Sequence, residues 1–442
     1  MMRLFTAALL PAFALLVAAP PASAMNIEKI VSPSGIEAWL VREQAVPLVT
    51  LNYSFHGGSS QDGAEKTGTA NLAADLLDEG AGDLDAKTFH ERLENHAIEL
   101  SFQVGRDEFH GSLRSLNEHR VEAFDLLQLA LTAPRFEAEA VERVRRQSVA
   151  GLQRDTTNPN SIASRRWWQT AFPGHPYGRE TKGTLESLPT ITADDLRDYV
   201  RRVFARNELT VSIVGDVDAK TAGELIDRAF AKLPAKNDLK PVADVKPEGL
   251  GRRIVVNLDV PQAVVTFGGQ GLARNDPDFM AGYIVNHILG GGSFSSRLYK
   301  EVREKRGLAY GVSDSLVWFK RAAVVLGGTA TRADRTGDAL AIIEAETKRM
   351  ADDGPTADEL AAAKSYLKGA YALSLDTSSK IAAQLTQIQL DRLGIDYMQR
   401  RSAMIDAVTL NDAKRVAKRL FGGGMLVTVV GRPKGLVSSG GE

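Results

Sequence analysis

The chain has 442 residues, with 54 lysines and arginines against 55 aspartates and glutamates, and it contains no cysteine. The balanced charge excludes the strong basic field that would attract nucleic acid or an anionic membrane. The missing cysteines exclude disulfides, thiolate metal ligands, cysteine nucleophiles and a lipid-modified cysteine anchor. At roughly 100 to 200 residues per domain, this length predicts two or more folded units.

The first 24 residues have the pattern of an export signal. Arg3 precedes an apolar stretch over 4–21, and residues 22–24 form an A-x-A cleavage site. Proline interrupts the apolar stretch, which falls short of the ~20 uninterrupted residues of a membrane span. No later stretch has that length either. We therefore predict a signal peptide over 1–24, a mature chain beginning near Met25 and a periplasmic location.

The mature chain repeats one pattern at a spacing of about 216 residues. Apolar runs bounded by glycine predict strands that form two matched pairs, 46–58 with 260–271 and 209–215 with 425–431. A helix-like segment with a threonine N-cap, Thr192 or Thr409, precedes the later strand of each copy. This spacing far exceeds that of repeat arrays, so it indicates duplication of a whole domain.

A proline-rich segment at 233–250 separates the two copies and is typical of a linker. It divides the chain into an N-terminal lobe over 25–232 and a C-terminal lobe over 251–435. Strands alternate with amphipathic helices in each lobe. The expected fold class is α+β, with two tandem homologous α/β sandwich lobes, each an antiparallel sheet flanked by helices.

Several short segments resemble one peptidase family. In chain order they are 57–60 (GGSS), 68–80 (GTANLAADLLDEG), 158–159 (NP), 175–178 (HPYG), 183–184 (GT), 289–298 (LGGGSFSSRL) and 307–310 (GLAY). The order and content resemble the insulinase, pitrilysin and mitochondrial-processing-peptidase family of zinc peptidases, over nearly the whole mature chain. The resemblance implies that the two lobes form one half of a clamshell around a chamber.

The zinc motif of that family is replaced in this chain. Active members carry H-x-x-E-H on the first helix, where two histidines share a face and the glutamate activates a zinc-bound water. The corresponding positions are Asn71, Ala74 and Asp75, and the family's distal glutamate ligand falls on Ala150 or Gly151. We therefore expect neither metal nor another cofactor in this chain.

The remaining histidines form no substitute motif. His90 and Glu94 share a helical face, but a third ligand is missing, so a solvated helix is the simpler interpretation. His287 lies on an apolar helix and is interpreted as a packed or capping residue. Asp75 alone would make a poor zinc site, and we interpret it as polar helix surface.

Arg303 and Tyr310 match an arginine and a tyrosine that family peptidases carry seven residues apart. The resemblance implies that this pair reaches from the C-terminal lobe to a zinc site, where it binds the substrate backbone and steadies the oxyanion. Both groups are strong hydrogen-bond donors suited to charge that forms in a transition state. Without the resemblance, Arg303 would be part of a charged helix surface and Tyr310 a half-buried strand residue.

The triplet Gly290, Gly291 and Gly292 allows two interpretations. It is not a nucleotide loop, because no G-x-x-x-x-G-K-[ST] pattern is present. The glycines fit the end of a helix followed by a turn. In the processing peptidases that the chain resembles, a glycine-rich loop of the non-catalytic subunit touches substrate, so the triplet is also a candidate for substrate binding.

Together, these features predict a non-catalytic subunit of a heterodimeric zinc metallopeptidase. The partner would be a homologous chain with H-x-x-E-H that holds zinc, and the substrates would be unfolded peptides. One alternative is an inactive pseudo-peptidase that binds peptides or acts as a scaffold in the cell envelope. A self-sufficient peptidase with another site is a third reading, although no ligand set in the sequence has the spacing that zinc needs.

Overall fold

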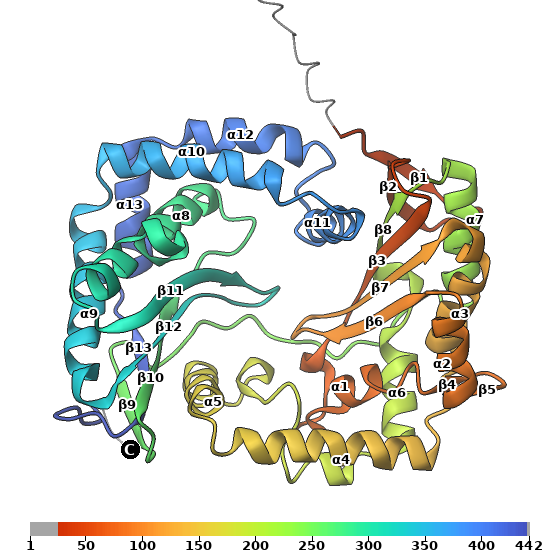
Figure 1. The fold of residues 1–442 in the computed structure, drawn as a ribbon, viewed down its shortest axis with the longest axis horizontal. Coiled ribbons are helices and arrows are strands. Elements are labelled where there is room, and N and C mark those ends of the chain that lie inside the picture. Colours follow the sequence, from red (N-terminus) through yellow and green to blue (C-terminus); the bar gives the residue numbers. More distant parts are fainter. Residues whose placement is uncertain (1–24, 440–442) are drawn as a thin grey trace, which may run out of the picture.

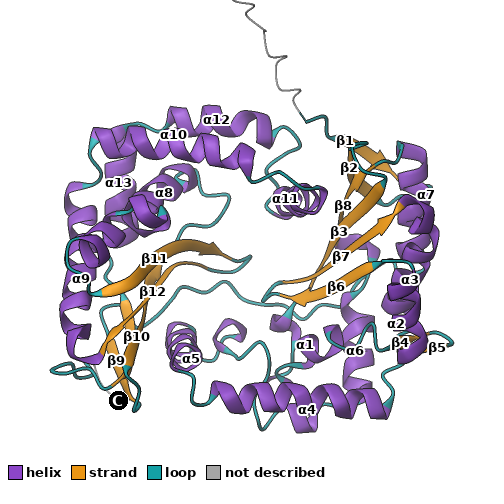
Figure 2. Cartoon of the chain, viewed as in Figure 1, coloured by secondary structure: helices purple, strands orange, loops and turns teal. Residues whose placement is uncertain are grey.

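The computed structural model describes residues 25–439, so the predicted signal peptide lies outside the described residues. The chain forms two lobes, each built on one sheet (Figure 1). The outer face of each sheet is covered by helices, and the inner faces are turned toward each other across the middle of the molecule (Figure 2). The predicted α+β class with two sandwich lobes is therefore confirmed.

The N-terminal lobe contains a six-stranded sheet and most of the first seven helices. Its large sheet has the order β1-β2-β8-β3-β7-β6. The strands are β1 (Glu28–Val31), β2 (Glu37–Arg42), β3 (Leu48–His56), β6 (Glu99–Val104), β7 (Glu108–Leu116) and β8 (Leu209–Gly215), with a small ribbon of β4 (Gly80–Ala81) and β5 (Leu84–Asp85). The helices are α1 (Thr69–Ala74), α2 (Ala86–Asn95), α3 (Arg120–Thr132), α4 (Ala138–Asp155), α5 (Pro159–Ala171), α6 (Ala193–Val203) and α7 (Ala219–Phe230).

The C-terminal lobe contains a five-stranded sheet of order β11-β12-β10-β13-β9. Its strands are β9 (Arg253–Asn257), β10 (Gln262–Gln270), β11 (Ala309–Trp318), β12 (Ala323–Arg332) and β13 (Leu426–Gly431). Its helices are α8 (Phe279–Asn286), α9 (Thr336–Asp353), α10 (Ala357–Leu373), α11 (Ser378–Leu390), α12 (Tyr397–Ala407) and α13 (Leu410–Phe421).

The two sheets share one topology. The order β2-β8-β3-β7-β6 of the first corresponds to β9-β13-β10-β12-β11 of the second, so matching strands lie at matching places. In sequence, β3 matches β10 and β8 matches β13. In the structure, β3 lies next to β8 in the first sheet, and β10 lies next to β13 in the second. The repeated sequence pattern therefore reflects a repeated fold.

One detail of the sheets differs from the expected antiparallel arrangement. β2 pairs with β8 in parallel, and β13 pairs with β9 in parallel, while the other pairs within each large sheet are antiparallel. β8 and β13 enter their sheets after a series of helices rather than through a hairpin. No tight turn fixes their direction, so a parallel neighbour is allowed.

The predicted threonine caps begin α6 and α13. Thr192 and Asp195 bond to each other's backbone N–H groups, and Thr409 and Asp412 do the same. Each capping box satisfies two N–H groups that the helix would otherwise leave unpaired. The helix that precedes the last repeated strand therefore starts in the same way in both lobes.

Each lobe has its own apolar core between its sheet and its outer helices. In the first lobe, the buried rings of Tyr53, Phe55, Phe204 and Phe230 contact one another. Fully burying one large apolar side chain stabilises a fold by ~1.5–3 kcal/mol. Each lobe therefore holds the side chains at its edges on a well-packed core.

Two helices cross between the lobes in a reciprocal way. α5 lies between β7 and β8 of the N-terminal sheet in sequence but packs on β10 and β13, whereas α11 of the C-terminal lobe packs on β3 and β8 (Figure 1). The Trp167 indole N–H donates to the carbonyl of Leu426 at 3.1 Å, and the Thr386 hydroxyl lies 3.0 Å from that of Ser212. Each lobe thus covers the inner face of the other lobe's sheet.

Candidate functional site

Helix α1 carries the positions that hold zinc in the active peptidases that the chain resembles. The Asn71 side chain donates to the carbonyl of Thr181 at 2.6 Å, and the Ala74 side chain is buried. Asp75 is the C-cap residue of this short helix. At the other end, the buried carboxylate of Asp62 accepts the backbone N–H groups of Gly68 and Ala70 and so anchors the start of α1.

These positions still surround one cavity of about 680 Å³. Asn71, Ala74, Asp75 and Gly151 all line it, so the fold brings the position expected for the distal ligand to the first helix. Ala150 is not among the lining residues that the structure describes. The fold therefore keeps these positions together around one cavity, although the residues at them are not the family's zinc ligands.

The side chains at these positions do not make up a set of zinc ligands. Burial raises the pKa of Asp75, and nearby Asp78 adds to the rise, while Lys182 opposes it. Zinc requires about four N, S or O ligands, and the positions here supply an amide, a methyl, one carboxylate and a glycine. Within residues 25–439, no group of three His, Asp or Glu side chains could hold a metal ion. The residues present do not fit zinc.

Arg303 and Tyr310 lie next to each other on the C-terminal lobe. Arg303 belongs to a π-helical turn over Tyr299–Glu304, and Tyr310 is the second residue of β11. The Arg303 guanidinium carbon lies 4.7 Å from the ring centroid of Tyr310 and 4.8 Å from that of Tyr299. Two aromatic rings thus contact the guanidinium, an arrangement that orients it while its charge and its hydrogen-bond donors are kept.

The donors of this pair are free for an external acceptor. Lys305 and Arg306, two and three residues after Arg303, both form ion pairs with Glu301. Among the residues described, neither the Arg303 guanidinium nor the Tyr310 hydroxyl has a hydrogen-bond or ion-pair partner, and Tyr310 is 86 % exposed. Tyr310 is therefore not the half-buried strand residue that its sequence context alone would suggest.

The glycine triplet lies at the end of a π-helical turn over His287–Gly291, which follows α8. Gly290 is buried: a Cβ there would lie 2.5 Å from a carboxyl oxygen of Asp314, so only glycine fits. Gly291 is exposed and Gly292 is half-buried, so these two residues are the parts of the triplet that another molecule can reach. The role of the triplet in substrate binding stays a prediction.

Buried Asp314 supports this turn from β11, the strand that carries Tyr310. Its carboxyl accepts a hydrogen bond of 2.7 Å from the Asn286 side chain. Burial raises the pKa of Asp314 to about 8, so the group is neutral near pH 7. A single buried acid thus packs against the glycine turn close to the pair. Nothing along the chain marks this group, because Asp314 lies between two polar residues, Ser313 and Ser315.

Two exposed aromatic residues extend the surface around the pair. Phe294, 70 % exposed, contacts the ring of Tyr299 edge-on, and Tyr366, 58 % exposed, stacks on His287. Sequence reasoning missed both, although an aromatic residue inside the Gly/Ser-rich run 290–296 was the available signal for Phe294. His287 is packed, as predicted, and its ring supports Tyr366.

The pair and the degenerate metal cavity are separate within this chain. The cavity lining runs from Asn71 to Leu188 and, as far as the chain is described, takes no residue from the C-terminal lobe. Arg303 and Tyr310 therefore do not face the chain's own Asn71 and Asp75.

Similarity to known proteins extends over most of the chain. Residues 40–185 match the family model of insulinase (peptidase family M16), and residues 190–367 match that of the peptidase M16 inactive domain. A non-peptidase homologue named YmxG from Helicobacter pylori is 29 % identical over 76 % of this chain and 77 % of its own. An uncharacterized zinc protease from Streptomyces coelicolor is 26 % identical over 92 % of this chain and 90 % of its own.

Solved structures show the same fold. The crystal structure of a peptidase M16 inactive domain from Pseudomonas fluorescens superposes with a TM-score of 0.87 at 26 % identity, covering 95 % of this chain and all of the other. A protease from Helicobacter pylori superposes with a TM-score of 0.83 at 18 % identity, covering 92 % of this chain and all of the other. The two family models together cover more than half of the chain. The chain therefore belongs to the insulinase family, peptidase family M16, and is one of its members without the H-x-x-E-H motif.

Proposed function

We propose that this chain is the non-catalytic subunit of a heterodimeric zinc peptidase and supplies Arg303 and Tyr310 to a partner's active site. The observation that carries the proposal is the combination of two donors without partners among the described residues, half-buried Arg303 and exposed Tyr310, with a cavity at the family's metal position that lacks the metal ligands. Such donors have no oxyanion to stabilise unless another chain brings a peptide carbonyl to them. The partner would be a homologous subunit with H-x-x-E-H that binds zinc.

In this arrangement each residue has a defined task. The Arg303 guanidinium donates to the peptide backbone in the ground state, since its contacts with the rings of Tyr299 and Tyr310 orient it. The Tyr310 hydroxyl donates to the carbonyl oxygen as negative charge develops there. Neither residue transfers a proton or makes a covalent bond. Metal chemistry, when present, belongs to the partner.

Unfolded peptides are the expected substrates. β6 and β11 are edge strands, each paired with one neighbour among the described strands, so their outer backbone groups can pair with an extended chain. β6 also lines the degenerate cavity through Ser101 and Phe102, and β11 carries Tyr310. A peptide in extended form could thus reach both features, whereas a folded protein could not present its backbone.

The alternative function is a pseudo-peptidase that binds peptides or scaffolds an envelope complex without assisting hydrolysis. The open cavity at the former metal position favours it, because a peptide side chain could enter there without any reaction. The two functions differ in one measurement. Co-expression of this chain with a homologue that carries H-x-x-E-H should give a complex that cleaves an unfolded peptide, while neither chain alone does so. A stable complex without activity would support the scaffold.

We also propose export to the periplasm, on the basis of the signal-like pattern over 1–24. None of the helices within residues 25–439 is long and apolar enough to span a bilayer. N-terminal sequencing of the protein from the envelope fraction should begin at or near Met25. An intact Met1 in the cytosol would contradict this location.

A further inference from the structure

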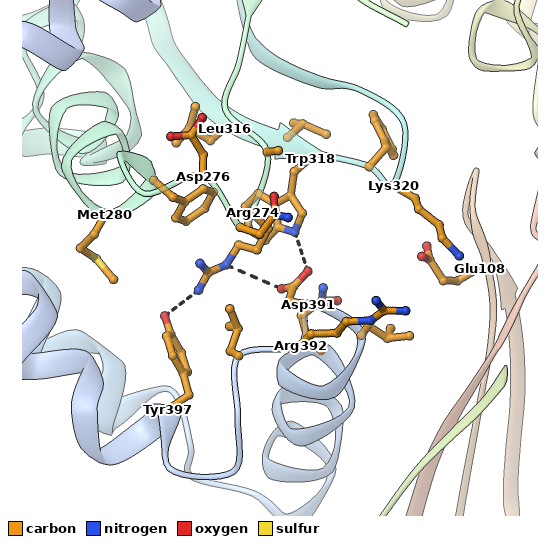
Figure 3. Close-up of a pocket in the computed structure, with 18 of the residues that line it drawn as sticks. Glu108, Arg274, Asp276, Met280, Leu316, Trp318, Lys320, Asp391, Arg392 and Tyr397 are labelled. Atoms are coloured by element: carbon orange, nitrogen blue, oxygen red, sulfur yellow. Dashed lines mark hydrogen bonds and ion pairs between the residues drawn. The ribbon is translucent and has the colours of Figure 1, made fainter. Parts of the chain in front are cut away.

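A cavity between the lobes has no part in the function proposed above. It encloses about 850 Å³, which is within the ~300–1,000 Å³ of ordinary ligand sites. Glu108 comes from the N-terminal lobe, Trp318 and Lys320 come from the end of β11 and the turn after it, and Arg392 follows α11 (Figure 3). Both lobes thus contribute charged side chains to one space.

Arg392 has an unusual backbone for its residue type. It follows the C-cap Asp391 of α11 with a φ of +54°, in the left-handed region that glycine favours. The backbone N–H of Arg392 donates to the Gln389 carbonyl, and the N–H of Leu393 donates to the Ile388 carbonyl. These two bonds close the helix end as they would around a glycine. By contrast, α9 ends on Gly354 at φ +73°. An arginine at this place is strained, which is common where a side chain has a functional task.

The Arg392 guanidinium has no hydrogen-bond or ion-pair partner within residues 25–439, although Asp391 precedes it in the chain and Glu108 lines the same cavity. Asp391 cannot neutralise it, because its carboxylate accepts from the Trp318 indole at 3.0 Å and pairs with Arg274 at 3.7 Å (Figure 3). Lys320, a second cation of this cavity, is 3.8 Å from Glu208. The cavity therefore holds an unpaired positive charge.

The acid opposite these cations does not cancel them near neutral pH. Burial raises the pKa of Glu108 to about 8, Asp107 adds to the rise, and Lys320 opposes it. His56, beside Glu108, has its pKa lowered, first by burial and then by Lys320. A protonated Glu108 can donate a hydrogen bond to an anion. Apolar side chains, including Trp318, Met280 and Leu316, line another part of the cavity.

We propose that the cavity between the lobes binds a peptide carboxylate through Arg392 and Lys320, with the adjacent apolar side chain of the peptide against Trp318. The carboxylate can belong to the C-terminus of a peptide or to an acidic side chain. This inference rests on the proposed function only in taking a peptide as the ligand. A peptide held here would span the two lobes.

The test uses the full mature chain without a partner. The probes are a fluorescein-labelled hexapeptide ending in Leu-Phe with a free carboxylate, the same peptide with a C-terminal amide, and an amidated peptide with an aspartate before the last residue. Fluorescence anisotropy gives each Kd. We expect the free acid to bind about 10-fold more tightly than the plain amide, the size of one charged hydrogen bond. The aspartate peptide then tells a C-terminal from a side-chain carboxylate.

Arg392→Gly is the decisive variant, because glycine suits the left-handed backbone and keeps the helix end intact. It should melt at the same or a higher temperature, yet bind the acid peptide no better than the amide. The matched control is Arg400→Gln: Arg400 lines the same cavity, but its guanidinium is already bound to Asp396 and to the Leu393 carbonyl. It should change the affinity less than about twofold, well under the effect of a charged hydrogen bond.

Three results would overturn the proposal: equal affinity of acid and amide for the wild type, undiminished acid binding by Arg392→Gly, or an equal loss in Arg400→Gln, which would indicate general charge attraction. None of them depends on peptide cleavage. A failed partner experiment would therefore leave this result standing, and the reverse also holds.

Discussion

The guanidinium carbon of Arg303 lies 4.7 Å from the ring centroid of Tyr310 and 4.8 Å from that of Tyr299, so it contacts both aromatic rings. These contacts fix the guanidinium without using any of its hydrogen-bond donors. Most arginines in the same segment are committed to carboxylates, as Arg306 is to Glu301. A fixed but unused donor is what a substrate-binding role requires, and it leads to separate predictions for the two residues.

Replacing Arg303 with lysine should weaken substrate binding by the assembled complex. Lysine keeps the charge but loses the flat guanidinium that contacts the aromatic rings and can donate two parallel hydrogen bonds. We expect KM to rise about 10-fold, with a smaller change in kcat, because the guanidinium binds the ground state as well as the transition state. Arg306→Lys is the control, since that side chain pairs with Glu301. Equal KM values in the two variants would argue against the assignment.

The isolated mature chain should bind no stoichiometric zinc. Asn71, Ala74 and Asp75 occupy the ligand positions, and Asn71 is already bonded to the Thr181 carbonyl. One carboxylate with no imidazole partner does not hold zinc against a chelator. Metal analysis by mass spectrometry after a chelator wash measures this. About one zinc per chain surviving the wash would refute the prediction and revive the reading as a self-sufficient peptidase.

Removing the Trp167 side chain should destabilise the contact between the lobes. The indole is fully buried between α5 and the C-terminal sheet, and its N–H bonds to the Leu426 carbonyl. Trp167→Ala should lower the free energy of unfolding by ~3–5 kcal/mol, as a large cavity and an unpaired carbonyl remain. Gln169→Ala on the exposed face of α5 should change it by less than ~0.5 kcal/mol. Urea unfolding compares them, and similar midpoints would contradict a tight α5 contact.

Asp314 should make stability depend on pH. Its folded pKa of about 8 lies above its unfolded value, so its contribution is fully present below about pH 4 and is lost as the pH rises to about 8. Asp314→Asn cannot ionise and avoids that loss. Relative to wild type, the variant should gain up to ~3 kcal/mol in unfolding free energy between pH 5 and pH 7.5. A variant-to-wild-type difference that does not change with pH would mean that Asp314 ionises normally.

The local patterns of the sequence predicted much of the fold. Glycine-bounded apolar runs identified β3, β8, β10 and β13, and the threonine caps identified α6 and α13, because both signals depend on neighbouring residues alone. The exchange of α5 and α11 was not predictable. An amphipathic helix shows that it has an apolar face, but not which of two similar sheets will cover that face.

The candidate site was predictable only in part. The replaced motif and the spacing of Arg303 and Tyr310 were visible, since they are fixed positions along the chain. The stack on Tyr299, the support by Asp314 and the surface formed by Phe294 and Tyr366 were not, because they depend on how π-helical turns orient side chains. The unpaired Arg392 likewise appears only when both lobes are in place.

The most direct test of the trans-acting pair is the kcat of the reconstituted complex with Tyr310→Phe in this chain. Phenylalanine keeps the ring under Arg303 and removes only the hydroxyl, so assembly and the partner's zinc content should be unchanged. Loss of one oxyanion donor typically lowers kcat by ~10²- to 10³-fold. Tyr366→Phe, which removes an exposed hydroxyl outside the pair, is the control and should keep the full rate. A Tyr310→Phe complex that cleaves peptide at the wild-type rate would show that the pair has no catalytic role, and would favour the scaffold.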